Sequence, residues 1–453
     1  MRRLSTKKIV PIAAIMLLLF TGNASVAQSG QDTLMLTLDQ ALEIALSENL
    51  TVKVADQEIT KQEYAKKGTY AALFPQIDAN GSYQRTIKKQ MMYMDMDLTG
   101  SGTIMDSGFP VGRDNDWAVG VSASMQLISP VLWKSLKISG YDVELSVEKA
   151  RSSRIEMADQ IRQAFYGVLL AGDSYHVFKE AYDNAVHNYN DIKQKFDQGL
   201  VAEFDLIRAD VNVKNAEPSM YDAENSLMLA SWRLKAIMGI DLGTNIKCIG
   251  RLADYEDTIA GGYILADLSL DSNSSLKQLD IQYNQLEEVR KLNRAQYYPT
   301  LSANFSYRYQ SSNNDFKFNN YNWDPYSTVG LTLSIPIFSG GKRHMDIKQS
   351  EINIRQLSDQ RMDTERNLRV SIKQYTDQMS TCVKQYNAAK AGVKQAEKSY
   401  NISAKRYETG EGTLLEINDS QLSLTQARLN LNQSIYSYMV AKSTLEKTLG
   451  NTK

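Results

Sequence analysis

Apolar residues recur along this chain with alternating spacings of four and three, and the pattern occurs twice, 211 residues apart. Such spacing keeps one stripe of a helix facing a partner, as in coiled coils. Because internal repeats define an architecture, we predict two equivalent long helical hairpins in one chain. The first stripe consists of Met157, Ile161, Ala164, Val168, Ala171, Tyr175, Phe178, Tyr182, Ala185, Tyr189, Ile192 and Phe196. The second, interrupted by one serine, consists of Leu368, Ile372, Tyr375, Met379, Cys382, Tyr386, Ala389, Val393, Ala396, Tyr400, Ser403 and Tyr407.

The same offset divides the chain into two halves, residues 28–240 and 273–453, with a connecting equatorial segment at 241–272. We expect long helices at about 131–198 and 339–409, each on the order of 100 Å at about 1.5 Å per residue. The hairpin tips then fall at 199–205 and 410–416. Helices of this length describe a tube rather than a compact domain.

Ahead of each long helix the apolar period changes from 3.5 to 2, which indicates strands. Trp117, Val119 and Val121, for example, alternate with small or polar residues. We expect strands at about 77–87, 117–128, 300–310 and 327–338. Runs of this length with one apolar and one polar face are typical of outer-membrane barrels. The alternative, a sheet packed on its own core in a soluble domain, is disfavoured because little else in the chain could cover it.

Four strands cannot close a barrel, and open sheet edges are not tolerated in lipid. Three copies of the chain would supply twelve strands, an even number within the observed range. Prolines mark both joints between the helical and strand segments. Pro75 and Pro299 precede the first strand of each pair, and Pro130 and Pro336 follow the second.

The first 27 residues are typical of a secretory signal peptide. Basic residues precede an apolar stretch at 9–20, and small residues at 25–27 offer a cleavage site. No cysteine follows that stretch, so we expect no lipid anchor. The mature chain should therefore be exported.

Composition excludes several function classes. A net charge of −1 gives no reason to expect nucleic acid as a partner. Two cysteines cannot form a disulfide framework. No nucleophile–base pair, phosphate loop or metal-ligand spacing is visible, so we expect no enzyme, no cofactor and no bound metal. His176, His187 and His344 are expected on helix surfaces.

Five methionines crowd the longer of two external connections: Met91, Met92, Met94, Met96 and Met105. Thioethers can bind Cu(I). We favour a flexible apolar loop, because this loop faces away from the tunnel and contains neither cysteine nor histidine.

Six segments together resemble the TolC family of outer-membrane efflux proteins: residues 38–46 with Asn49, 70–75, 295–301, 333–341, 196–205 and 407–416. The resemblance implies a mainly α-helical protein with transmembrane β-strands. It implies a homotrimer with a twelve-stranded barrel in the outer membrane and a twelve-helix periplasmic tunnel. The implied partners are outer-membrane lipid, a periplasmic adaptor (membrane fusion) protein and an inner-membrane pump.

The expected function is the exit duct of a tripartite efflux system for small molecules or ions, in the outer membrane with a long periplasmic portion. One alternative is the outer-membrane channel of a type I protein secretion system. Another, of a different class, is a periplasmic coiled-coil scaffold without a pore. The alternating strands with Trp117, Tyr83, Phe305 and Tyr307 disfavour the scaffold, which needs no lipid-facing aromatic band.

The hairpin tips carry the candidate site residues. Gly199, Gly410 and Gly412 are expected to allow the turns between helices. By resemblance, the tips are where the adaptor packs. The apolar candidates for this contact are Leu200, Val201, Phe204, Leu414 and Leu415.

Acidic residues just past the tips suggest a periplasmic gate. Glu416 and Asp419 share a helix face at spacing i, i+3 and match the family's acidic constriction pair. Asp205 occupies the place of Glu416 in the first copy, and Tyr407 is the fourth gate candidate. Gly412 stands where some family members carry a basic residue that ties the tip. We therefore expect the acidic pair to lack that latch and Tyr407 to lack its partner.

Overall fold

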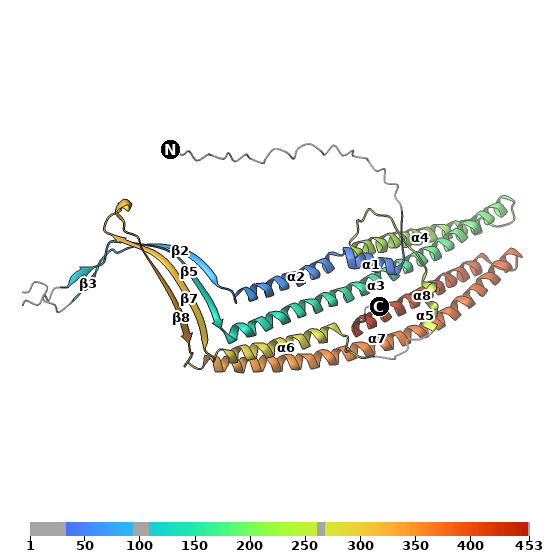
Figure 1. Cartoon of the computed structure of the whole chain (residues 1–453). Helices are drawn as coiled ribbons and strands as arrows, with labels where there is room; N and C mark the ends of the chain where they lie inside the picture. Colours follow the sequence, from blue (N-terminus) through green and yellow to red (C-terminus); the bar gives the residue numbers. More distant parts are fainter. Residues whose placement is uncertain (1–32, 94–107, 261–267, 452–453) are drawn as a thin grey trace, which may run out of the picture.

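The chain forms an elongated rod with a sheet at one end and two helical hairpins reaching away from it (Figure 1). The computed structural model describes residues 33–93, 108–260 and 268–451. Two helices run most of the length of the rod: α3, Pro130–Asp197, has 68 residues, and α7, Lys342–Glu408, has 67. After each of them the chain turns back and forms a shorter antiparallel helix, α4 at Glu203–Met238 and α8 at Leu414–Leu449.

Local residues explain where these helices begin and end. Ser129 caps α3 by accepting a hydrogen bond from the Leu132 amide, and Pro130 occupies the first turn. The long helix of the second half starts at Lys342, three residues later than the sequence suggests. Gly340 and Gly341, which precede it, both have positive φ and so lie outside the helix.

Two short helices extend the hairpins toward the sheet. α2, Leu50–Ala71, begins where α4 ends, and α6, Ser274–Ala295, begins where α8 ends. The two joints are built alike. Asn49 caps α2 and donates a 2.7 Å hydrogen bond to the Ile237 carbonyl of α4. Asn273 caps α6 and donates a 2.7 Å bond to the Thr448 carbonyl of α8.

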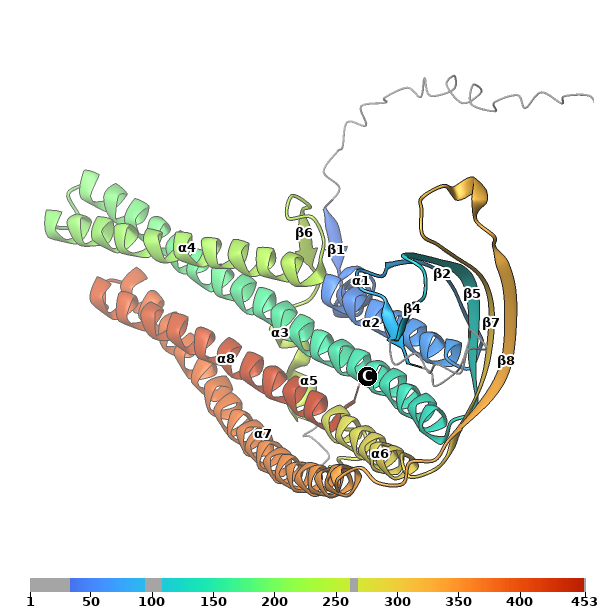
Figure 2. The same ribbon diagram turned by 90° about the vertical axis from the view of Figure 1, so that its left-hand side faces the viewer.

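The sheet has four antiparallel strands in the order β2-β5-β7-β8. They span Gln76–Arg85, Asn115–Ile128, Thr300–Asn313 and Asp324–Ser334. The last strand ends four residues before the expected limit, just ahead of Pro336. Figure 2 shows the strands side by side as one curved layer, and within the described chain β2 and β8 are its edges.

The strand register places apolar and polar residues on opposite faces of the sheet. Ala79, Val121 and Tyr307 face each other across three strands. On the other face, Ser122 and Ser306 continue into Thr328. In the protomer most of the apolar face is open to solvent, because within the described chain no other layer covers it.

The main hydrophobic core lies at mid-length, around α3. α1, Leu38–Glu48, packs on α3, and β1, Leu34–Leu36, pairs in parallel with β6, Ile246–Cys248. The 3₁₀ turn Leu252–Tyr255 and α5, Glu256–Ala260, complete this region. Phe165, Leu234 and Tyr438 are among its fully buried side chains.

The external connections are described in part. β3, Gln90–Met92, pairs with β4, Phe109–Val111, and a short 3₁₀ turn, Phe318–Asn320, lies between β7 and β8. Met91 and Met92 are exposed on β3. Met94, Met96 and Met105, the signal segment 1–27 and residues 261–267 of the equatorial segment lie outside the described residues.

Among the helices that the structure describes, none combines the length and hydropathy needed to cross a membrane.

Candidate functional site

The tips of the two hairpins lie at the end of the rod that is farthest from the sheet (Figure 1). Gly199 and Gly410 end α3 and α7 with φ of 73° and 80°, a conformation that favours glycine. Gly412 was expected to play the same part, but its φ is not positive. A Cβ atom there would lie 3.0 Å from the Arg406 Cβ and from the Tyr407 amide nitrogen, so Gly412 permits a close approach of the chain.

A small apolar cluster holds the two tips together. Ile192 of α3, Ala209 of α4 and Leu414 of α8 are buried in it, and Val201 and Tyr407 pack against them. Leu414, which is 5% exposed, was expected to contact an adaptor protein. In the protomer the Leu414 side chain is instead used to pack the tips, and Val201 is partly used in the same way.

Three of the expected contact residues do remain open. Leu200 and Phe204 are 69% and 68% exposed, and Leu415 is 45% exposed. Phe204 and Leu415 occupy matching places in the two sequence copies. Large exposed apolar side chains gathered at one end of a molecule indicate a surface for another protein.

Glu416 has a basic partner that the sequence reasoning missed. Its Oε2 lies 3.1 Å from Nη1 of Arg406, in the last turn of α7. Arg406 also donates a hydrogen bond to the Glu411 carbonyl, and the Gly412 amide donates to the Arg406 carbonyl. Position 412 supplies no basic group, as expected, but Glu416 has a different basic partner, which comes from ten residues upstream.

Tyr407 also has a basic partner from a position other than 412. The Nζ atom of Lys195 lies 4.9 Å from the centre of its ring, close enough for a cation–π contact. Burial raises the pKa of the Tyr407 hydroxyl, and the negative charges of Asp205 and Asp191 raise it further. The structure thus brings Tyr407 and Asp205 together across the two hairpins, and Lys195 is a second residue that sequence reasoning missed.

Asp419 lies exposed on α8, one turn beyond Glu416. The 211-residue offset places Arg208 of α4 at the position of Asp419. The first copy therefore carries an acid and a base, Asp205 and Arg208, where the second carries two acids. This signal was available in the sequence and was overlooked.

Within the described ranges, no three His, Cys, Asp or Glu side chains are grouped so that they could hold a metal ion. His176, His187 and His344 are exposed on helices. The titratable groups at the tips are thus arranged as charges along helix ends.

A long helical rod that carries an amphipathic sheet defines a class of membrane-associated conduit proteins. The chain belongs to the outer membrane efflux protein family, whose model matches residues 41–240 and 265–451. The resemblance to the TolC family is thereby confirmed.

Individual relatives and solved structures agree with this assignment. The chain is 20% identical to the outer membrane protein TolC of Vibrio cholerae, over 75% of this chain and 78% of that protein. It is 21% identical to the pyoverdine export outer membrane protein OpmQ of Pseudomonas aeruginosa, over 91% and 85%. The Campylobacter jejuni CmeC outer membrane channel has a similar fold, with a TM-score of 0.70, 19% identity and coverage of 91% and 85%. The open-state Neisseria gonorrhoeae MtrE channel also scores 0.70, at 14% identity with coverage of 91% and 89%.

The protein is therefore an outer-membrane protein that serves efflux or secretion as a duct. Its family comprises transport channels rather than enzymes.

Proposed function

We propose that three copies of this chain form one duct, with a twelve-stranded barrel in the outer membrane and a twelve-helix tunnel in the periplasm. The observation that carries the proposal is the four-stranded sheet, which has one apolar face and, within the described ranges, two unpaired edges, β2 and β8. A lipid environment leaves no partner for unpaired backbone groups, so such edges must be joined to other strands. Pairing β8 of one copy with β2 of the next closes the ring.

The two faces of the sheet support the same arrangement. Val329, Leu331 and Leu333 are among the most exposed apolar residues of the protomer and all lie on the apolar face of β8. In the barrel this face contacts lipid. The serine and threonine side chains of the opposite face line the water-filled lumen.

The helices are left incomplete in a similar way. α3 has neighbours on both sides, with α2 and α4 on one and α6 and α8 on the other. Within the described chain α7 packs along its length against α6 and α8, and it reaches α5 and α3 only locally, through the Lys390–Glu256 ion pair and the Lys195–Tyr407 contact at the tips. In the trimer its free side packs against α2 and α4 of the next copy.

The duct passes small molecules or ions that a periplasmic adaptor protein and an inner-membrane pump deliver. Two relatives have names with such cargo: the cobalt-zinc-cadmium resistance protein CzcC and OpmQ. A third, AprF, is named for alkaline protease secretion. The adaptor docks on the exposed side chains Leu200, Phe204 and Leu415 at the tips, near Gly199 and Gly410.

The periplasmic mouth is gated by acidic side chains at the tips. Threefold symmetry turns Glu416, Asp419 and Asp205 into rings of carboxylates, which attract cations and repel one another. Tyr407 ties the two hairpins of each copy together beside Asp205.

The assembly is tested by measuring the mass of the purified protein in a mild detergent. Three copies are expected. A monomer under conditions that preserve the sheet, as judged by circular dichroism, would refute the proposal.

Adaptor docking is tested by the double variant Leu200→Asp, Leu415→Asp. A charge buried without a partner is costly in a protein interface, so export should be lost while the trimer still forms. Val147→Asp, which changes an exposed apolar residue of α3 far from the tips, is the matched control. Normal export from the double variant would show that the tips do not dock a partner.

The cargo is tested in cells that contain a compatible pump but have no outer-membrane channel of their own. Expression of this protein should lower the accumulation of a small fluorescent dye. Restoration of protease secretion without any change in dye accumulation would favour the protein-secretion alternative.

A further inference from the structure

The protomer contains an internal seam where its two halves meet, formed by α3 on one side and α6 and α8 on the other. We propose that neighbouring copies pack against each other in the same geometry as the two halves of one copy. Where the internal seam is held by ion pairs and hydrogen bonds, the seam between copies is formed mainly by apolar side chains. Three pairs define it: Tyr64 with Met345, Leu50 with Met362, and Trp232 with Val370, where the first residue of each pair belongs to the next copy. This inference rests on the proposed trimer and specifies how its subunits are matched.

The correspondence between the two seams follows from matched landmarks in the two halves. Gly239 and Gly450 end α4 and α8, which sets an offset of 211 residues between those helices. The heptad stripes of α3 and α7 have the same offset. The capping residues Asn49 and Asn273 set an offset of 224 residues between α2 and α6. Each contact across the internal seam can therefore be transferred to a residue pair between copies.

Near the sheet, the internal seam is held by an ion pair. Nζ of Lys134 lies 3.3 Å from Oε2 of Glu288, whose side chain is almost fully buried. At the equivalent positions of the seam between copies, Met345 of α7 stands in place of Lys134, and Tyr64 of α2 in the next copy stands in place of Glu288. A thioether beside an aromatic ring is a favourable contact.

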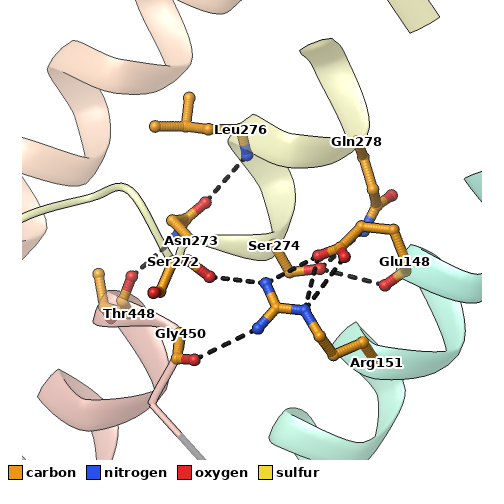
Figure 3. Close-up of polar contacts among 9 residues, drawn as sticks. All are labelled: Glu148, Arg151, Ser272, Asn273, Ser274, Leu276, Gln278, Thr448 and Gly450. Carbon is orange, nitrogen blue, oxygen red and sulfur yellow. Dashed lines mark hydrogen bonds and ion pairs between the residues drawn. The ribbon is translucent and has the colours of Figure 1, made fainter. Parts of the chain in front are cut away.

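At mid-height the seam is held by Arg151, which lies where α8 meets α6 (Figure 3). Its guanidinium donates to the Ser272 carbonyl at 2.6 Å and to the Gly450 carbonyl at 3.4 Å, and it pairs with Glu148 at 2.8 Å. The hydroxyl of Ser274 donates to the Glu148 carbonyl.

At the matching positions between copies, the guanidinium and the hydroxyl that bridge this joint are absent. Arg151 becomes Met362 and Ser274 becomes Leu50. Both replacements are large and apolar, whereas Glu148 and Ser272 are matched by the acidic residues Asp359 and Glu48. The two bridging side chains of Figure 3 therefore have apolar counterparts, and the acidic residue beside them does not.

Farther toward the tips, a buried carboxylate crosses the internal seam. Asp159 of α3 accepts a 2.7 Å hydrogen bond from Ser443 and lies 3.0 Å from Nζ of Lys447. Asp159 becomes Val370, Ser443 becomes Trp232 and Lys447 becomes Ala236. A charged cluster is again replaced by apolar side chains.

The exposure of these side chains in the protomer provides independent support. Tyr64, Met345, Leu50, Met362, Trp232 and Val370 are each between 47% and 74% exposed. Six large apolar side chains at matching heights on two free helix faces would be costly to leave in water. A second copy is the occupant that fits, because the internal seam shows that the equivalent faces of α3, α6 and α8 pack together.

Association between copies explains the difference in chemistry. Apolar area removed from water drives assembly, and interfaces between identical subunits are richer in it than ordinary surfaces. Some contacts of the internal seam transfer as polar pairs. Gln285 with Asp142 becomes Lys61 with Asn353, which can still form a hydrogen bond, whereas the Arg162–Glu446 ion pair becomes Lys373 and Lys235.

The pairing is tested by thiol cross-linking in a background without native cysteines, Cys248→Ser with Cys382→Ala. The double variant Tyr64→Cys, Met345→Cys is treated with a short bis-maleimide in membranes and separated on a denaturing gel. Linked dimers and trimers are expected, with at least tenfold more product than from the mismatched pair Trp232→Cys, Met345→Cys. Positions 345 and 370 are about 37 Å apart along α7, so Met345 cannot reach a residue that faces Val370.

Two further pairs complete the test. Lys134→Cys with Glu288→Cys lies on the internal seam and should link within one chain without raising its mass. Leu50→Cys with Met362→Cys should repeat the linked trimer if the first pair fails to assemble. If matched and mismatched pairs link equally in a protein that is trimeric by mass, the proposed residue pairing between copies is refuted, but the proposed trimeric duct is not. A monomeric mass would overturn both.

Discussion

Arg406 masks the negative charge of Glu416, and replacing Arg406 with glutamine should make that charge accessible to other cations. The two side chains form an ion pair at 3.1 Å and are 39% and 50% exposed, so water screens the pair in part. In the proposed trimer the Arg406→Gln change frees three carboxylates at the periplasmic mouth. The backbone at the tip should persist, because Gly412 and Thr413 still make their hydrogen bonds.

The size of the effect follows from Coulomb's law. Two unit charges 4 Å apart interact by about 1 kcal/mol in bulk water and about 4 kcal/mol at an effective dielectric constant of about 20. The exposure of Glu416 favours the lower figure. A monovalent cation near the freed carboxylate gains about 1 kcal/mol, about fivefold in occupancy, and a divalent cation gains about 2 kcal/mol, about thirtyfold.

Single-channel recording in planar bilayers measures this effect. In Arg406→Gln the divalent-cation concentration that half-blocks the channel should fall by about tenfold or more. Arg406→Lys should retain most of the masking. Lys405→Gln is the matched control, since it makes the same charge change one residue away, where the cation pairs with Glu408. The reasoning fails if Arg406→Gln leaves the block unchanged or if Lys405→Gln alters it equally.

Three other outcomes are expected. Replacing both Glu416 and Asp419 with alanine should weaken cation selectivity and multivalent block, and unchanged conductance properties would place these side chains outside the lumen. Lys447→Met should lower the free energy of unfolding by about 3 kcal/mol in chemical denaturation, because Asp159 is 2% exposed and keeps only its two side-chain hydrogen bonds. A loss below about 1 kcal/mol would mean that water reaches the carboxylate. Gly450→Ala should lower the melting temperature, because φ at this position is +81° and the added Cβ would lie 2.1 Å from the Ser272 carbonyl oxygen, just before α6. An unchanged melting temperature would count against the close packing of this joint.

Periodic features of the sequence were sufficient for the main elements. The 3.5-residue stripes indicated α3 and α7, and the change to period two indicated strands at β2, β5, β7 and β8. These patterns are local, because a helix or strand exposes its buried face at a fixed spacing. The prolines at both joints marked the ends of these elements for the same reason, since proline restricts its own backbone and that of the residue before it.

The offset between the two copies held more information than the stripes alone. It placed Gly199 on Gly410, both of which have positive φ. It also places Arg208 on Asp419 and Met362 on Arg151. These differences between otherwise equivalent positions distinguish the seam within a chain from the proposed seam between chains.

The tertiary structure alone decided which tip residues remain accessible. Leu414 and Leu415 are adjacent and equally apolar, yet one packs against Ile192 and Ala209 and the other faces solvent. Which of the two is buried depends on the angle at which α8 leaves the turn relative to a helix more than 200 residues away. No local pattern carries that angle.

The same reason applies to the partners of the charged groups. Arg406 reaches Glu416 because the chain folds back closely at Gly412, and Lys195 reaches Tyr407 because the two hairpins pack at their ends. The sequence by itself determined the helices, the strands and their duplication, since these depend on spacing along the chain. The tertiary structure decided which side chains meet at the tips, since contacts between distant segments depend on how whole helices pack.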